Sequence, residues 1–111
     1  MKRERIYISI PISGYDFEEV KERARRARER LLYDAFGLKN GWHRPDVITP
    51  FDVCSEPDKP YSYYMGKDIE ALLECDAIYL CEGWQNSKGC MAEFEVARIY
   101  GKEILFESWA R

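Results

Sequence analysis

The feature that most constrains the fold is a short apolar run at residues 77–81, which follows Asp76 and precedes Gly83. A strand that is buried on both faces is apolar throughout, whereas a strand with one solvent-exposed face alternates apolar and polar residues. The run therefore predicts a strand in the middle of a parallel sheet. Asp76, at its start, is expected to cap or turn the chain.

Strand-like and helix-like segments alternate around this run. Further strands are predicted in three places: residues 5–10, 46–49 and 103–106. Helices are predicted in three others: residues 17–36, 61–75 and 88–100. The order predicts an α/β fold of three layers, whose parallel sheet has about four strands in the order 2-1-3-4. One helix then covers one face of the sheet and two cover the other, so we expect the thinly covered face to favour a homo-oligomer.

The first strand and the first helix have clear periodicities. Ile6, Ile8 and Ile10 share one face of the strand, while Tyr7 and Ser9 share the other. The helix is predicted to begin after a capping box of Asp16 and Glu19 and to end at Gly37. Its predicted core-facing residues are Phe17, Val20, Ala24, Ala27, Leu31 and Ala35. Its arginines and lysine alternate with glutamates, which favours a solvated face over a phosphate or nucleic-acid patch.

Length and composition exclude several classes of protein. A chain of 111 residues predicts one domain over residues 1–111, and its net charge of −3 argues against a nucleic-acid polymer as partner. No apolar run approaches the roughly 20 residues that span a bilayer, and residues 1–5 have no signal-peptide core. We therefore predict a cytoplasmic protein without membrane partner, metal or cofactor. The cysteines, which are expected to be reduced thiols, are Cys54, Cys75, Cys81 and Cys90. The lone His43, in a turn, is given no role, and residues 51–60 are predicted to be a loop over a site.

Two carboxylates lie on apolar flanks of predicted helices. On a helical wheel, Glu93 lies opposite the solvated arc of its helix, near Cys90 and Ala97. Asp68 similarly lies off the solvated arc of the preceding helix. A carboxylate on a buried face costs several kcal/mol unless it is paired or its pKa shifts. Glu93 is therefore either neutralised by a structural partner or placed to meet a ligand, and its position beside a glycine-bearing loop favours the ligand.

Open parallel sheets bind ligands beyond the carboxyl ends of their strands, where the strand order reverses. Here that point lies between the first and third strands. The candidate binding residues in the loops after those strands are Pro11, Ser13, Gly14, Gly83, Trp84, Ser87 and Gly89. Two carboxylates, aromatic rings and a helix N-terminus suit a sugar or a nucleotide. Each residue also has a structural alternative: Tyr7 as core, Asp68 facing a solvated loop, Trp84 as packing, and Ser87 with Gly89 as a helix cap.

These motifs together resemble the nucleoside 2-deoxyribosyltransferase-like superfamily, in particular its branch of small bacterial and phage proteins. The resemblance covers nearly the whole chain. It is carried by Ile6-Tyr7-Ile8-Ser9 with Pro11-Ile12-Ser13-Gly14, by Lys67-Asp68-Ile69 with Cys75-Asp76-Ala77, and by Ser87-x-Gly89-x-x-x-Glu93-x-x-x-Ala97.

The resemblance implies a flavodoxin-like (Rossmann-like) fold and cleavage of the N-glycosidic bond of a 2′-deoxynucleoside or its 5′-monophosphate, by hydrolysis or transfer. Glu93 matches the family's nucleophile, which forms a glycosyl-enzyme ester. Asp68 matches a carboxylate that binds the sugar and handles protons, and Tyr7 matches a tyrosine that hydrogen-bonds the nucleophile. In the family a neighbouring subunit commonly completes the site. From the hydroxyl of Tyr7 and the helix dipole we expect Glu93 to be ionised at neutral pH.

The chain departs from the family pattern in two places. The transferases carry Asp-x-Gly where this chain has Ser87-Lys88-Gly89, so base exchange does not follow from the resemblance. The monophosphate-hydrolysing branch has a Ser and an Arg after the first strand, where this chain has Pro11 and Ser13. Two other functions therefore remain open: a non-catalytic nucleotide-binding or sensing module, and a structural protein whose carboxylates are merely paired.

Overall fold

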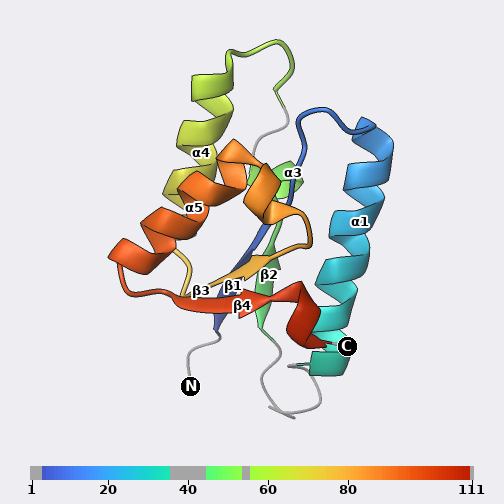
Figure 1. The fold of residues 1–111 in the computed structure, drawn as a ribbon, viewed down its shortest axis with the longest axis vertical. Coiled ribbons are helices and arrows are strands. Elements are labelled where there is room, and N and C mark those ends of the chain that lie inside the picture. The colour runs from blue at the N-terminus through green and yellow to red at the C-terminus, as the bar shows by residue number, and fades with distance from the viewer. Residues whose placement is uncertain (1–3, 36–44, 54–55, 111) are drawn as a thin grey trace.

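The computed structural model describes residues 4–35, 45–53 and 56–110, and the side chains of all of these except 34, 35, 109 and 110. Its four strands are β1 (Arg5–Ser9), β2 (Asp46–Ile48), β3 (Ala77–Leu80) and β4 (Glu103–Phe106). They form one parallel sheet in the order β2-β1-β3-β4 (Figure 1). The predicted α/β class and strand order are thus confirmed. The predictions for Gly37, His43 and Cys54 lie outside the described residues.

Three long helices follow the predicted segments. They are α1 (Phe17–Arg30), continued by a π-helical turn (Leu31–Ala35), α4 (Tyr61–Leu73) and α5 (Lys88–Ile99). The carboxylate of Asp16 accepts a hydrogen bond from the Glu19 amide at 3.1 Å and so caps α1 as predicted. None of the helices in the described residues is both long enough and apolar enough to cross a bilayer.

A fourth helix lies where the sequence predicted only a loop. This single turn, α3 (Pro50–Val53), begins directly after β2. The amide and hydroxyl of Thr49 both donate to the carboxylate of Asp52, at 3.0 and 3.1 Å, and proline is favoured at the first position of a helix. The prediction failed here because these local hydrogen bonds join only two residues, and a helix of four residues is too short to show a periodicity.

The two faces of the sheet have separate cores. The side chains of Ile6, Ile8 and Tyr79 pack with Val20 and Leu31 on the α1 side. On the other face Tyr7, Ile78 and Leu80 pack with residues of α4 and α5. Figure 1 shows the same arrangement, with α1 on the right of the sheet and α4 and α5 on the left. The alternation of β1 thus places Tyr7 under α4 and α5.

Phe17 departs from the predicted core stripe of α1. Val20, Ala24, Ala27 and Leu31 are buried as expected, but Phe17 is 55% exposed. Its ring makes an edge-to-face contact with Phe51 of α3, with centroids 5.3 Å apart. Phe17 is the first residue of the helix and lies beyond the end of the strands, so the sheet does not reach it. The helical periodicity predicted the side of the helix on which Phe17 lies, but it could not show where the sheet ends.

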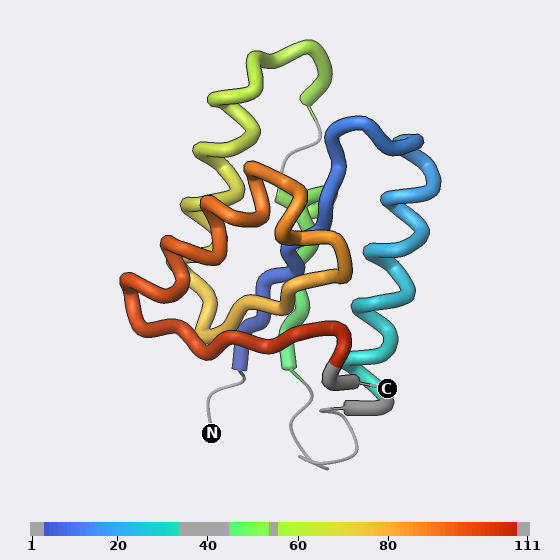
Figure 2. Tube along the Cα trace, viewed as in Figure 1, coloured from blue at the N-terminus to red at the C-terminus, as the bar shows by residue number. Residues whose placement is uncertain are grey.

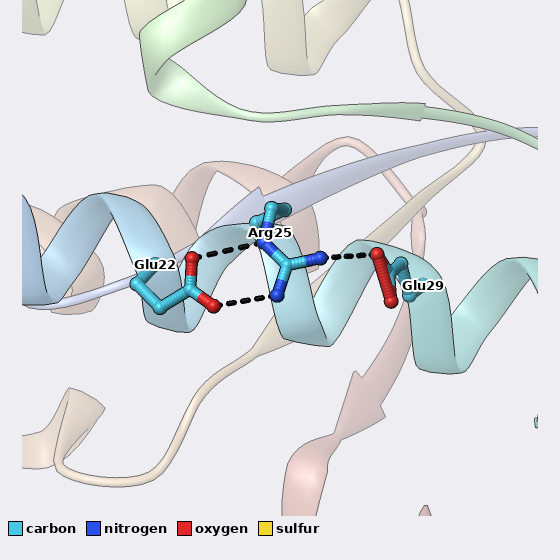
Figure 3. A network of polar contacts seen from close by, with 3 residues as sticks. All are labelled: Glu22, Arg25 and Glu29. Carbon is cyan, nitrogen blue, oxygen red and sulfur yellow. Dashed lines mark hydrogen bonds and ion pairs between the residues drawn. The ribbon is translucent and has the colours of Figure 1, made fainter.

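The remaining face of α1 is solvated, as the sequence indicated. Arg25 forms ion pairs with Glu22, one turn before it, and with Glu29, one turn after it (Figure 3). All three side chains are about half exposed. Water screens the attraction within exposed pairs of this kind, so each contributes little to the stability of the helix. The charges of this face are thus solvated and paired with one another along α1.

The sheet register brings the carboxyl ends of β1 and β3 together. Ser9 of β1 lies opposite Leu80 of β3 in the parallel ladder. The amide of Cys81 then donates to the carbonyl of Ser9 at 3.0 Å. The loops that leave these two strands therefore start side by side, and Figure 2 shows the chain trace around them, with the start of α4 also at the upper end of the molecule.

Burial in the second core predicts how two adjacent leucines of α4 differ. Leu72 is fully buried, whereas Leu73 is 39% exposed. We expect Leu72→Ala to lower the free energy of unfolding by about 2–5 kcal/mol, because it leaves a cavity under α4. Leu73→Ala, the matched control, should cost less than about 1 kcal/mol. Urea unfolding followed by circular dichroism measures both, and equal losses would contradict the burial.

Candidate functional site

The carboxylate of Glu93 is buried and held by two hydroxyl groups. Glu93 is on α5, and only 4% of its surface is exposed. The Tyr7 hydroxyl donates to its Oε2 at 2.9 Å, and the Ser9 hydroxyl donates to its Oε1 at 2.6 Å. Both donors come from β1 and are fully buried. Among the described residues, the partners of Glu93 are thus hydroxyls and not the guanidinium that would mark a structural ion pair.

Glu93 also lines a large cavity of about 860 Å³ at the carboxyl ends of the strands. Six segments contribute to its walls: the loop after β1, the first residue of α1, α3, residues 56–57, α4, and the loop before α5 with the first turns of that helix. The lining residues besides Glu93 are Ile10, Pro11, Ile12, Ser13, Tyr15, Phe17, Pro50, Phe51, Glu56, Pro57, Tyr61, Tyr64, Met65, Asp68, Gly83, Asn86, Ser87, Lys88, Gly89 and Cys90. This volume is in the usual range for small-molecule sites.

The cavity contains a second carboxylate whose electrostatics are linked to those of Glu93. Burial raises the pKa of Asp68 to about 7, and the Tyr7 hydroxyl opposes this rise. Burial likewise raises the pKa of Glu93 to about 7. The hydrogen bond from Ser9 lowers the pKa of Glu93, the negative charge of Asp68 raises it, and the hydrogen bond from Tyr7 lowers it. The two acids therefore titrate near neutrality as an interacting pair.

The raised pKa of Glu93 corrects the prediction that this residue is fully ionised at neutral pH. With a pKa of about 7, about half of the Glu93 side chains are protonated at that pH. The sequence indicated the apolar wall and the Tyr7 hydroxyl, but not how completely the helix and sheet remove water. Desolvation has the larger effect, and two hydrogen bonds offset only part of it.

The start of α5 is shaped by its glycines and by a serine cap. Gly83 adopts a left-handed conformation with φ of +90°, which lets the chain turn sharply out of β3. Ser87 caps α5 by accepting a hydrogen bond from the Cys90 amide at 3.2 Å. A Cβ on Gly89 would lie 3.1 Å from the Tyr61 hydroxyl, so glycine lets α4 approach this turn closely.

The structure brings most of the predicted site residues together. Asp68, Pro11, Ser13, Gly83, Ser87 and Gly89 all line the cavity with Glu93. Tyr7 lies beneath it and reaches the carboxylate. Trp84 and Gly14 are not among the lining residues. The Trp84 ring instead packs against Phe94 and Phe106, with centroids 5.0 and 5.8 Å apart, so its packing alternative holds.

Sequence reasoning missed Ser9 and the aromatic wall. Ser9 shares a strand face with Tyr7, and a hydroxyl inside an apolar strand needs a partner, which was a usable signal. The aromatic wall has no comparable signal: Phe51, Tyr61 and Tyr64 come from α3 and α4, which only the folded chain brings to the cavity. Their sequence spacing relative to Glu93 carries no information on this proximity.

The chain matches a known protein family over most of its length. The family described as a domain of unknown function, DUF4406, matches residues 4–106. The chain belongs to this family. No curated protein matches it. The match covers all four strands of the sheet and the whole cavity, so the site described above lies within the DUF4406 domain.

The thiols of this DUF4406 domain are buried. Cys75, Cys81 and Cys90 are free, as predicted for the cysteines that the structure describes. Burial raises the pKa of the Cys90 thiol, which lines the cavity beside Glu93. Cys90 is therefore a neutral wall residue near pH 7. In the described part of the chain, no three His, Cys, Asp or Glu side chains come together as a metal site would require.

The shifted pKa of Glu93 predicts how stability depends on pH. Because its pKa rises from 4.5 to about 7, the folded protein binds more protons than the unfolded chain between those values. This contribution to stability is full below about pH 4.5 and is lost as the pH rises through about 7. At higher pH the buried charge costs about 3 kcal/mol. We therefore expect Glu93→Gln to raise Tm at pH 8.5 and to change it little at pH 5.

Glu95→Gln is the matched control on the exposed face of α5. Glu95 pairs with Arg98, and the hydrogen bond from that guanidinium lowers its pKa. Its contribution to stability is therefore present at neutral pH and lost in acid, and removing it should lower Tm slightly. Thermal unfolding over pH 5–8.5 compares the two variants. A Glu93→Gln protein that is less stable than the parent at pH 8.5 would contradict the buried-charge argument.

Proposed function

We propose that this protein cleaves the N-glycosidic bond of a 2′-deoxynucleoside or its 5′-monophosphate through a covalent intermediate on Glu93. The single observation that carries the proposal is the position of that carboxylate. It is buried, its partners in the described part of the chain are hydroxyls and not a cation, and it faces a cavity of about 860 Å³ that also contains Asp68. A paired structural carboxylate needs neither the cavity nor the second acid. The resemblance to the deoxyribosyltransferase-like proteins supports the same assignment.

The chemistry follows from this arrangement. The ionised carboxylate of Glu93 attacks the anomeric carbon, C1′, and forms an ester bond as the C1′–N bond breaks. The electron pair of that bond leaves with the base, which takes up a proton. Water, or a second base, then attacks C1′, gives a proton to the carboxylate of Asp68 and releases Glu93 as a carboxylate. Water gives hydrolysis and a second base gives transfer.

Asp68 supplies the proton for the departing base. The reaction needs one ionised carboxylate to attack and one proton for the departing base. Two interacting acids with pKa values of about 7 are mostly present near pH 7 as a singly protonated pair. The aromatic residues Tyr15, Phe51 and Tyr61 line the same cavity and suit the stacking of a nucleobase.

Glu93→Ala should abolish release of free base, with a loss of at least about 10³-fold in kcat/KM. The measurement is chromatography of free bases after incubation with each deoxynucleoside and each 5′-monophosphate, with and without an acceptor base. Glu95→Gln, on the solvent side of the same helix, should react at the parent rate. Mass spectrometry of denatured parent enzyme should show a deoxyribosyl adduct on the Glu93 peptide. Base release by Glu93→Ala at the parent rate would refute the proposal.

The linked acids predict a bell-shaped pH dependence of kcat/KM with its maximum near pH 7. The ascending limb reflects ionisation of Glu93, and the descending limb reflects loss of the proton from Asp68. Asp68→Asn should lower kcat/KM by about 10²-fold or more and remove the descending limb. Its ascending limb should stay close to the parental position, because Asp68 is still protonated and uncharged when Glu93 first ionises.

Glu70→Gln is the control for this experiment, since Glu70 is an exposed acid of the same helix that does not line the cavity. It should keep the rate and the bell shape of the parent. If Asp68→Asn retains both limbs at unchanged positions, Asp68 is not the proton donor.

A further inference from the structure

The two oxygens of the Glu93 carboxylate are fixed from one side. Tyr7 and Ser9 are two residues apart on β1 and so share the strand face toward α5. Each gives its hydroxyl to a different oxygen of Glu93. Glu93 lines the cavity, whereas neither Tyr7 nor Ser9 does. The hydroxyls therefore hold the carboxylate from the sheet side, and the lone pairs that they leave free are accessible from the cavity.

We propose that Ser9 is a positioning residue, whose hydroxyl fixes Oε1 of Glu93 so that the carboxylate is held in one orientation toward the substrate. The proposal rests on the proposed function and adds to it a residue that neither the resemblance nor the sequence motifs single out. One hydrogen bond leaves a carboxylate free to rotate about its Cγ–Cδ bond. A second hydrogen bond, to the other oxygen, fixes its plane, and the nucleophile is then aimed before the substrate arrives.

Ser9 and Tyr7 differ in the length of their hydrogen bonds to Glu93 and in their effect on its pKa. The Ser9 contact is the shorter of the two, at 2.6 Å against 2.9 Å. The Tyr7 hydroxyl also interacts with Asp68, so its one proton is shared between two carboxylates. The Ser9 hydroxyl also contacts the Cys90 thiol, but that thiol is neutral and does not compete with Glu93 as a second anion. The hydrogen bond from Ser9 has the larger lowering effect on the pKa of Glu93. Loss of Ser9 should therefore affect the ionisation of the nucleophile more than loss of Tyr7.

Few groups near Glu93 titrate in the relevant pH range. Among the described residues, those that influence its pKa or lie beside it are Tyr7 from β1, Asp68 from α4 and Cys90 from α5 itself. Burial raises the pKa of both the Tyr7 phenol and the Cys90 thiol, so both stay neutral up to alkaline pH. Asp68 is then the one group that titrates together with Glu93. A shift of the ascending limb can be assigned to Glu93 once the Asp68→Asn background is used.

The test is Ser9→Ala, which removes one oxygen and leaves the strand intact. We expect kcat to fall about 10- to 100-fold at pH 7 with KM within about threefold of the parent, as for loss of a hydrogen bond to a charged group. The ascending limb, measured in the Asp68→Asn background where the descending limb is absent, should move to higher pH by about one pH unit, so that part of the lost rate returns at alkaline pH. Ser9→Thr keeps the hydroxyl and should retain the parental pH profile. Thr49→Val removes another buried strand-end hydroxyl, which bonds to Asp52, and should leave the profile unchanged.

A measurement without turnover separates this inference from the proposed function. Carbon-13 NMR of the side-chain carboxyl of Glu93, in the ligand-free protein, follows its titration directly. Ser9→Ala should move that titration to higher pH, and by more than Tyr7→Phe does. If the parent releases no base from any substrate, the proposed function fails, yet this titration still reports whether Ser9 holds the carboxylate. An unchanged titration in Ser9→Ala, with the fold intact by circular dichroism, would overturn the role of Ser9.

Discussion

The site depends on one costly arrangement, a carboxylate placed between a helix and a sheet with almost no contact to water. Burying such a group without partners costs several kcal/mol, which is a large part of the stability of a domain of this size. The protein lowers this cost with two hydroxyls of β1, and no cation of the described residues cancels it. Glu93 consequently keeps a raised pKa.

The fold makes this arrangement possible through the parallel pairing of β1 and β3. Their register places two loops and the start of α5 at one edge of the sheet. The alternation of β1 then presents Tyr7 and Ser9 toward α5, on the side opposite to α1. Gly83 turns the chain, and Gly89 allows α4 to approach, so Asp68 enters the same cavity. Burial and proximity, and not any unusual residue type, bring both acids to a pKa of about 7.

Particular elements show which features of the structure sequence patterns can predict and which they cannot. The period-two alternation of β1 and the capping box at Asp16 predicted both elements, because each pattern depends on neighbours within a few residues. The same periodicity wrongly placed Phe17 in the core, since a helical wheel gives direction but not where the sheet ends. α3 was missed because Thr49, Pro50 and Asp52 form it without periodicity. Trp84 was a candidate for ligand stacking, but Phe94 and Phe106 occupy its ring faces, and both follow it in the chain.

The sequence by itself determined the order of strands and helices, the parallel sheet with its 2-1-3-4 order, and the anomalous acid on the apolar flank of α5. These follow from local periodicity and from the handedness of crossovers, both of which depend on segments that are close together in the sequence. Tertiary structure alone decided that Ser9 and Tyr7 reach opposite oxygens of Glu93, that α3 and α4 supply an aromatic wall, and that desolvation outweighs the hydrogen bonds to Glu93. Those outcomes depend on contacts between residues up to 86 positions apart, whose distances no spacing in the sequence encodes.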